Sequence, residues 1–424
     1  MRKSSVVSNI SKLIDILLAL FLILNCQSLY QNSATSDYHI YEITLILILL
    51  SMLLHGIQYP LISKAKMNHT AVYSLIYFII AVFILIIDVS KPDWLSYSAR
   101  FLIAPLILFY FLPVDDLKKK IRLMHYFVDW TILITLISLF FFILGTNLNL
   151  ISPTGTFRYE WGNILNAQSY YNLYFGGVQY ADGGILNGVL YRNTAIFVEG
   201  PMYAAVLDLS LFFLYILKND FKFFKTAFLT LMVGIITSNS TTAIIIGIIL
   251  TFFAFRDTNF AKRLKNIIIL PVIVIVIFLL IEIIFSKAGS FSSTSSFGIR
   301  YDDYMAGFQA WIRSPILGWG YNNLSVINSF RENAANAGFS NSIFAILNGG
   351  GLLFGSLYLF PIFHALLRRK RNHMQVELSL IYLLLLILVL FYTSYINFFI
   401  WALLLDDDLW DRYIREERDN EKNG

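Results

Sequence analysis

The sequence predicts an all-α fold, a polytopic membrane helix bundle of about 11–12 transmembrane helices with two large non-cytoplasmic loops. Its 424 residues are 57% hydrophobic and only 14% charged, and the mean hydropathy is +0.66. Soluble domains carry about 25% charged and about 45–50% apolar residues. Apolar runs of about 20 residues recur along the chain, and a helix of about that length crosses the roughly 30 Å hydrocarbon layer.

Short polar stretches separate most of these runs, so each run predicts one helix in a single integral membrane domain over 1–424. Residues 222–255 hold two short runs, which predict either a hairpin or a broken helix. The last run is too long for one span, which leaves open the side of the charged tail at 406–424. The predicted spans are 13–30, 41–59, 70–88, 95–112, 124–145, 194–217, 222–237, 242–255, 266–286, 339–366 and 376–405.

The distribution of lysine and arginine predicts the orientation, because cytoplasmic loops are rich in these residues. The N-terminus is expected in the cytoplasm, with the first outer loop at 146–193 and the second outer loop at 287–338 outside. The net charge of +5 follows from this pattern and does not indicate nucleic-acid binding. The predicted cytoplasmic segments hold 20 lysines and arginines, and the opposite side holds 8: Lys91, Arg100, Arg158, Arg192, Lys287, Arg300, Arg313 and Arg331.

The richest polar segment precedes the sixth predicted span and contains Arg192 and Glu199. On a continuous helix these two residues would share one face, two turns apart. However, Gly200 and Pro201 are typical of a helix start, whose free N–H groups and positive dipole end attract phosphate or carboxylate. A glutamate within an apolar stretch is a functional candidate. The alternative is an Arg192–Glu199 ion pair that only stabilises the bundle.

The second outer loop contains a stretch with the pattern of an amphipathic helix lying on the outer membrane interface. Arg300 is expected at the mouth of the cavity that this loop covers. Arg313 lies on the polar face, where it either contacts a ligand or is simply solvated. The apolar face comprises Tyr301, Tyr304, Met305, Phe308, Trp311 and Ile312.

Further polar residues lie near the outer ends of other predicted spans. Ser340 and Asn341 open a glycine-rich span, where they either hydrogen-bond a ligand or cap the helix. Arg100 is another guanidinium in the outer leaflet. The sequence shows no zinc-type cluster, phosphate-binding loop or outward-facing Asp-x-Asp pair, because Asp302 and Asp303 are adjacent rather than spaced, and its only cysteine, Cys26, lies in the first apolar run. We therefore expect neither a metal nor another cofactor.

Taken in order, these motifs resemble those of the Wzy-type polysaccharide polymerases, which share a superfamily with the O-antigen ligases. The resemblance covers about 95–365 and includes the arginine before Phe-Val-Glu-Gly-Pro, at 192 and 197–201. It also includes Gly-x-Arg at 298–300, Pro-Ile-Leu-Gly-Trp-Gly at 315–320 and Ser340-Asn341. It implies a metal-independent glycosyltransferase of the bacterial cytoplasmic membrane. Such an enzyme joins undecaprenyl-pyrophosphate-linked oligosaccharides into O-antigen, capsule or exopolysaccharide on the outer side, alongside a flippase and a chain-length regulator.

The resemblance also implies roles for the candidate residues. Guanidinium groups bind the pyrophosphate oxygens and neutralise the leaving group. Glu199 accepts the proton of the attacking hydroxyl, which requires burial to raise its pKa towards neutrality. The expected catalytic residues are Glu199, Arg192 and Arg300; the expected pyrophosphate ligands are Arg192, Arg300, Arg313 and Arg100; and the expected glycan contacts are Tyr301, Trp311, Ser340 and Asn341.

Two alternatives to a polymerase remain at this point. A ligase would transfer the finished glycan to another acceptor, but ligases of the superfamily usually carry histidine where this chain has Ser340. A lipid-linked oligosaccharide flippase would be expected to show internal repeats and broken helices near the middle of the membrane. The sequence shows no convincing repeat, and its polar residues cluster towards the outer side.

Overall fold

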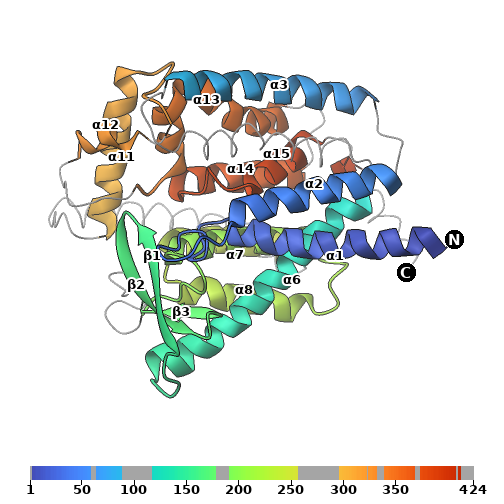
Figure 1. Cartoon of the computed structure of the whole chain (residues 1–424), viewed down its shortest axis with the longest axis vertical. Coiled ribbons are helices and arrows are strands. Elements are labelled where there is room, and N and C mark those ends of the chain that lie inside the picture. The colour runs from blue at the N-terminus through green and yellow to red at the C-terminus, as the bar shows by residue number, and fades with distance from the viewer. Residues whose placement is uncertain are drawn as a thin grey trace.

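The computed structural model describes residues 2–58, 64–87, 117–177, 191–255, 296–321, 323–331, 339–367, 373–406 and 409–411. The predicted all-α membrane fold is confirmed, since apolar helices make up most of the described chain (Figure 1). Within the described ranges, three helices are long and apolar enough to cross a membrane: Val7–Leu24, Lys120–Asn147 and Ser342–Leu367. Seven shorter apolar helices accompany them.

The helices follow most of the predicted spans. The predicted spans 95–112 and 266–286 lie outside the described residues. The first predicted span, 13–30, is wrong at its end, because its helix stops at Leu24 and 25–30 belong to the loop before α2. The sixth differs at its start, because its helix begins only at Gly200. The helices that correspond to predicted spans are α1 (Arg2–Leu24), α2 (Ile40–Gln58), α3 (Lys64–Ile87), α6 (Leu117–Phe141, extended by a π-helical turn at Phe142–Asn147), α7 (Gly200–Ile216), α8 (Phe224–Thr237), α9 (Thr241–Phe255), α13 (Ser342–Leu367), α14 (His373–Leu388) and α15 (Ile396–Leu405).

Helix α7 forms the centre of one half of the bundle. All 17 of its residues are buried, and it packs against α6, α8, α9 and α14. In the other half, α13 packs against α3, α14 and α15. The two halves appear as the lower and upper parts of Figure 1. A helix that is apolar on all sides is expected at such a central position.

Helices α8 and α9 form a hairpin, which decides between the two readings of 222–255. The Phe255 ring at the end of α9 lies 6.1 Å from Phe224 and 5.1 Å from Phe228 at the start of α8. Rings this close require the helices to run antiparallel. The turn between them lies against the segment before α7, where Asn193 N–H donates to the Thr237 carbonyl at 3.0 Å.

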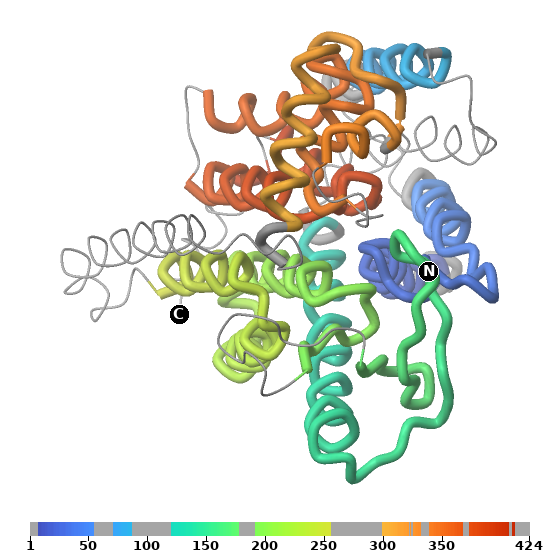
Figure 2. The backbone as a smooth tube through the Cα atoms, turned by 90° about the vertical axis from the view of Figure 1, so that its left-hand side faces the viewer, coloured from blue at the N-terminus to red at the C-terminus, as the bar shows by residue number. Residues whose placement is uncertain are grey.

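Both predicted outer loops lie at the same end of the molecule, opposite the start of α1 (Figure 1). The first loop contains an antiparallel sheet of β1 (Gly155–Trp161), β2 (Asn163–Tyr170) and β3 (Tyr174–Gly176), in the order β1-β2-β3. The second contains α11 (Ser296–Arg313) and α12 (Leu324–Asn328). Figure 2 looks onto this end and shows the sheet and α11 lying across the helix ends.

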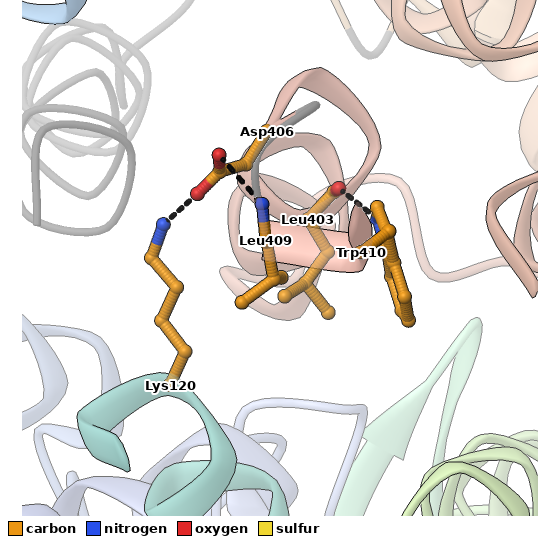
Figure 3. Close-up of polar contacts among 5 residues, drawn as sticks. All are labelled: Lys120, Leu403, Asp406, Leu409 and Trp410. Carbon is orange, nitrogen blue, oxygen red and sulfur yellow. Dashed lines mark hydrogen bonds and ion pairs between the residues drawn. The ribbon is translucent and has the colours of Figure 1, made fainter. Parts of the chain in front are cut away.

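An ion pair locates the beginning of the charged tail. Lys120 near the start of α6 contacts Asp406 directly after α15, and both side chains are buried (Figure 3). The backbone N–H of Leu409 also donates to Asp406 at 3.3 Å. The last predicted span is in fact two helices, α14 and α15, joined by a connector at 389–395. The tail therefore begins on the same side as the basic start of α6.

Helix α13 is broken at its glycines. Gly350 and Gly351 leave the helical conformation, and Gly351 has φ 62° and ψ −157°. The second outer loop enters this break: Leu352 N–H donates to the Pro315 carbonyl at 2.8 Å, and Trp319 N–H donates to the Asn348 carbonyl at 2.6 Å. The loop thus satisfies backbone groups that would otherwise be unpaired in an apolar environment.

We expect Gly351→Ala to destabilise the protein strongly and Gly349→Ala to have little effect. A β-carbon at Gly351 would lie 2.1 Å from the Ile316 carbonyl oxygen, whereas at Gly349 the nearest atom is 3.8 Å away. Backbone strain at such a position costs about 1–3 kcal/mol, and the clash adds to it. Thermal unfolding of the purified variants in detergent measures the difference, and equal midpoints would contradict the docking of 315–319 into α13.

Candidate functional site

The segment 191–199 leads into α7 without being helical. It is held by the α1–α2 loop at 25–39: Val198 N–H donates to the Gln27 carbonyl at 3.1 Å, and Leu29 N–H donates to the Ile196 carbonyl at 2.8 Å. Ser28 and Phe197 form an isolated β-bridge. Arg192 and Glu199 therefore do not share a face of one helix, and their relative position is fixed by tertiary contacts.

Glu199 is the residue directly before α7, as its place before Gly200-Pro201 predicts. It is extended (φ −156°, ψ 161°), and its carbonyl accepts from Met202 N–H at 3.2 Å. Its half-buried carboxylate does not cap the helix, so it is not committed to that role. The α7 amino end supplies positive potential here, which favours an anion.

Gly200 allows three elements to meet at this point. A β-carbon at Gly200 would lie 2.7 Å from the Ser238 carbonyl oxygen in the α8–α9 turn and 3.7 Å from Arg192 Cδ. The half-buried Arg192 side chain therefore passes directly beside the start of α7. The structure thus brings Arg192 to the helix end that follows Glu199.

The sheet of the first outer loop reaches the same place through Tyr159. Burial and the nearby Glu199 carboxylate raise the pKa of Tyr159 to about 12. The phenol is therefore neutral at ordinary pH and presents an O–H group. Its strand is attached to the α1–α2 loop, since Glu160 N–H donates to the Asn32 carbonyl at 2.8 Å. Tyr159 was not predicted as a site residue, although Phe157 and Tyr159 alternate with exposed residues as in a strand.

Arg300 lies in a second group of contacts, around the end of α14. Its Nη1 donates to the Leu388 carbonyl at 3.2 Å, and the neighbouring Tyr304 hydroxyl contacts the Ile387 carbonyl. The connector that follows is held by Ser342, whose hydroxyl accepts from Phe391 N–H at 2.9 Å. Arg300 is half-buried, so its guanidinium is held by backbone yet remains partly accessible.

The α1–α2 loop joins the two groups. Gln27, whose carbonyl holds Val198, also approaches Thr393 of the connector, with 3.5 Å between Nε2 and Oγ1. Asn25 accepts from the Tyr395 N–H at 2.6 Å. The segments before α7 and after α14 therefore contact the same short loop. Nothing in the sequence identified this loop as part of the site, because its role depends on partners hundreds of residues away.

Helix α11 shows the predicted amphipathic pattern. Most of the predicted apolar face is exposed, including Tyr301, although Tyr304 and Trp311 are half-buried. The opposite face packs on α13 through small residues such as Ala306 and Gly307. On that opposite face Asp303 is buried and paired with Arg331 at 2.7 Å. Trp311 is half-buried, and its indole N–H donates to the Pro315 carbonyl at 3.2 Å.

The other predicted ligands are not all brought together. Arg313 is thirteen residues from Arg300, which is about 20 Å along a helix, so the two cannot contact one phosphate. Its guanidinium lies 4.5 Å from the ring centre of Phe330. Arg100 lies outside the described residues. Any pyrophosphate role for Arg313 and Arg100 stays a prediction.

Ser340 and Asn341 precede α13, as expected. Asn341 Oδ1 accepts from Phe344 N–H at 3.0 Å, so this residue caps the helix. Ser340 lies beside Asp303 and, with Arg331, lowers the pKa of that carboxyl, while the larger effect of burial raises it. Glycan binding by these two residues stays a prediction. Among the described residues, no three histidine, cysteine or acidic side chains are grouped to hold a metal.

The sequence was compared with models of known protein families. Residues 226–359 match the family model described as O-Antigen ligase. This match supports the O-antigen ligase and polymerase superfamily. The matched stretch includes Arg300, the Asp303–Arg331 pair and Asn341, whereas Arg192 and Glu199 precede it. The match supports a ligase- or polymerase-type function in general and does not distinguish between the two. A search of curated proteins finds no match to the chain.

Proposed function

We propose that the protein is a polysaccharide polymerase that joins lipid-linked oligosaccharide repeat units on the outer side of the bacterial cytoplasmic membrane. The observation that carries the proposal is the position of Glu199. Glu199 is half-buried at the amino end of a central apolar helix, where the Arg192 side chain passes beside Gly200, and α11, which carries Arg300, lies at the same end of the molecule. A base and guanidinium groups on one side of a membrane bundle suit transfer from a pyrophosphate carrier.

In the proposed reaction, a hydroxyl of one repeat unit attacks the anomeric carbon of the glycan on undecaprenyl pyrophosphate. The new glycosidic C–O bond forms as the bond from the anomeric carbon to the phosphate oxygen breaks. Glu199 takes the hydroxyl proton, and the pyrophosphate carrier leaves with the electron pair of the broken bond. Arg192 and Arg300 stabilise the negative charge on that leaving group, since guanidinium groups stay charged and bind phosphate oxygens bidentately.

A ligase is the second candidate, and the match to the O-Antigen ligase family model favours it. It would use the same donor and the same leaving group but a different acceptor. The residue at 340 favours the polymerase, because the resemblance implies a histidine there in ligases and this chain has Ser340 beside Asp303.

The two candidates are separated by reconstituting the protein in liposomes with one lipid-linked repeat unit and no other acceptor. A polymerase produces a ladder of products that differ by one repeat unit, together with released carrier pyrophosphate. A ligase leaves the repeat unit unextended until its own acceptor is added. Absence of a ladder from a folded, inserted protein supplied with its native repeat unit would refute the polymerase.

A further inference from the structure

A line of buried hydroxyl groups runs along the interface between α6 and α7. Thr131, Thr135 and Ser138 are three or four residues apart on α6 and therefore share one face of that helix. Each is at most 1% exposed. Tyr203 and Ser210 lie opposite on α7, and both are fully buried. Hydroxyl groups in such a setting hold membrane helices together.

Part of this line continues to the candidate site. The Tyr203 hydroxyl donates to Thr135 Oγ1 at 3.0 Å and lies 3.2 Å from Ser138 Oγ. Ser138 Oγ in turn accepts from Asn193 Nδ2 at 3.2 Å. Asn193 directly follows Arg192, and its amide also donates to Thr237 Oγ1 in the α8–α9 turn at 3.2 Å.

Tyr203 contacts the other end of the same segment as well. Its ring stacks on Phe197, with 5.7 Å between the ring centres and 18° between the planes. Its backbone N–H donates to the Glu199 carbonyl at 3.3 Å. One side chain therefore connects to the residue after Arg192 through Ser138 and to the residues around Glu199 directly.

We propose that Tyr203 is a positioning residue, which holds Arg192 and Glu199 at the separation that the proposed glycosyl transfer requires. This inference rests on the proposed function, because it assigns those two residues to one reaction. Displacing a reacting group by about 1 Å can cost on the order of 100-fold in rate. The Tyr203 hydroxyl reaches Asn193, the neighbour of Arg192, through Ser138, and the Tyr203 ring stacks on Phe197, two residues before Glu199. This side chain is therefore suited to prevent such a displacement.

The same interface supplies a matched control. Ser210 Oγ donates to Thr131 Oγ1 at 2.8 Å, between the same two helices and at the same degree of burial. Among the described residues, the two hydroxyl groups bond to each other and to the Phe127 carbonyl, and neither bonds to the segment 191–199. Ser210→Ala therefore removes an equivalent polar contact without loosening the site, and Tyr203→Phe removes one hydroxyl while keeping the stacked ring.

The test compares wild type, Tyr203→Phe, Ser138→Ala and Ser210→Ala in liposomes with a lipid-linked repeat unit. Initial rates give kcat and KM, and amide hydrogen exchange reports the mobility of 193–199. We expect Tyr203→Phe and Ser138→Ala to lower kcat at least about tenfold with KM unchanged. Exchange at 193–199 should accelerate in these two variants only, while all three variants lose similar thermal stability.

The outcomes separate this inference from the proposed function. Unchanged exchange at 193–199 in Tyr203→Phe, or a kcat equal to that of Ser210→Ala, overturns the positioning role. If wild type forms no polymer yet exchange accelerates selectively in Tyr203→Phe, the proposed reaction is wrong. In that case the role of Tyr203 in holding the segment stands.

Discussion

Glu199→Gln is expected to abolish polymer formation while leaving the protein folded and inserted. Glutamine has nearly the same shape as glutamate but cannot accept the hydroxyl proton. General acid–base groups typically contribute about 10²–10⁴-fold to the rate, so the loss should exceed about 100-fold. Glutamine keeps the size and hydrogen-bonding capacity of the glutamate side chain, and the carboxylate does not cap α7, so we expect the variant to keep most of its stability. The rate of ladder formation in liposomes and the thermal midpoint measure the two effects.

Arg192→Ala and Arg300→Ala are expected to cause losses of similar size. Each removes a guanidinium proposed to stabilise the leaving pyrophosphate, and loss of one such donor typically costs on the order of 10²–10³-fold. Lysine in either position should restore only part of the rate, because it cannot bind phosphate bidentately.

Two exposed residues of strand β1 supply matched controls for these variants. Glu160→Gln removes a carboxylate one residue from Tyr159, and Arg158→Ala removes a guanidinium from the same outer loop. Both should leave the rate within about twofold of wild type, since surface substitutions of this kind act weakly. Normal polymer length in Glu199→Gln, Arg192→Ala and Arg300→Ala would refute the assignment of the site.

The sequence predicted the helices well because a long apolar run has few other stable states in a membrane. It predicted the start of α7 from Gly200-Pro201, since glycine admits the close approach of Ser238 and proline fits the first turn. The break in α13 was not predicted, because Gly350 and Gly351 lie within uninterrupted apolar sequence. The sheet was also missed, although two alternating segments flank Gly162, which has φ 72°.

Some residues of the candidate site could likewise be predicted from the sequence, and others could not. Arg192, Glu199 and Arg300 were recognisable because charged residues at membrane boundaries are costly and therefore stand out. Gln27, Tyr159 and Tyr203 were not, because their roles arise from contacts between distant segments. No local sequence pattern indicates that the segments near residues 27, 198 and 393 are in contact. Local sequence therefore identified the charged residues that are able to take part in the reaction. The structure identified the residues that hold them in position.

The Asp303–Arg331 pair gives the largest expected effect on stability. Both side chains are at most 2% exposed and lie 2.7 Å apart, joining α11 to the segment after α12. Arg331→Met would leave Asp303 buried without its opposite charge, and breaking such a pair typically costs about 3–5 kcal/mol. Asp302→Asn, a change at the half-buried neighbouring residue, should cost far less. Thermal or denaturant unfolding in detergent measures these differences.

The pH dependence of Arg331→Met provides a second, independent check. Burial already raises the pKa of Asp303, and Arg331 lowers it, so removing Arg331 should raise this pKa further. A carboxyl whose pKa is higher in the folded than in the unfolded state favours folding at a pH below its pKa in the unfolded state. That contribution is lost as the pH rises through the folded value. The loss in free energy of unfolding of Arg331→Met relative to wild type should therefore be small in acid and grow towards neutral pH.

The double variant Asp303→Asn/Arg331→Met decides whether the charge or the packing is responsible. With both charges removed, no uncompensated ion stays buried, so most of the lost stability should return and the added pH dependence should disappear. If the double variant is as unstable as Arg331→Met at every pH, the loss comes from packing around Arg331. Such packing includes Phe339, whose ring centre lies 5.7 Å from the guanidinium. The pair would then not hold α11 in place by its charges.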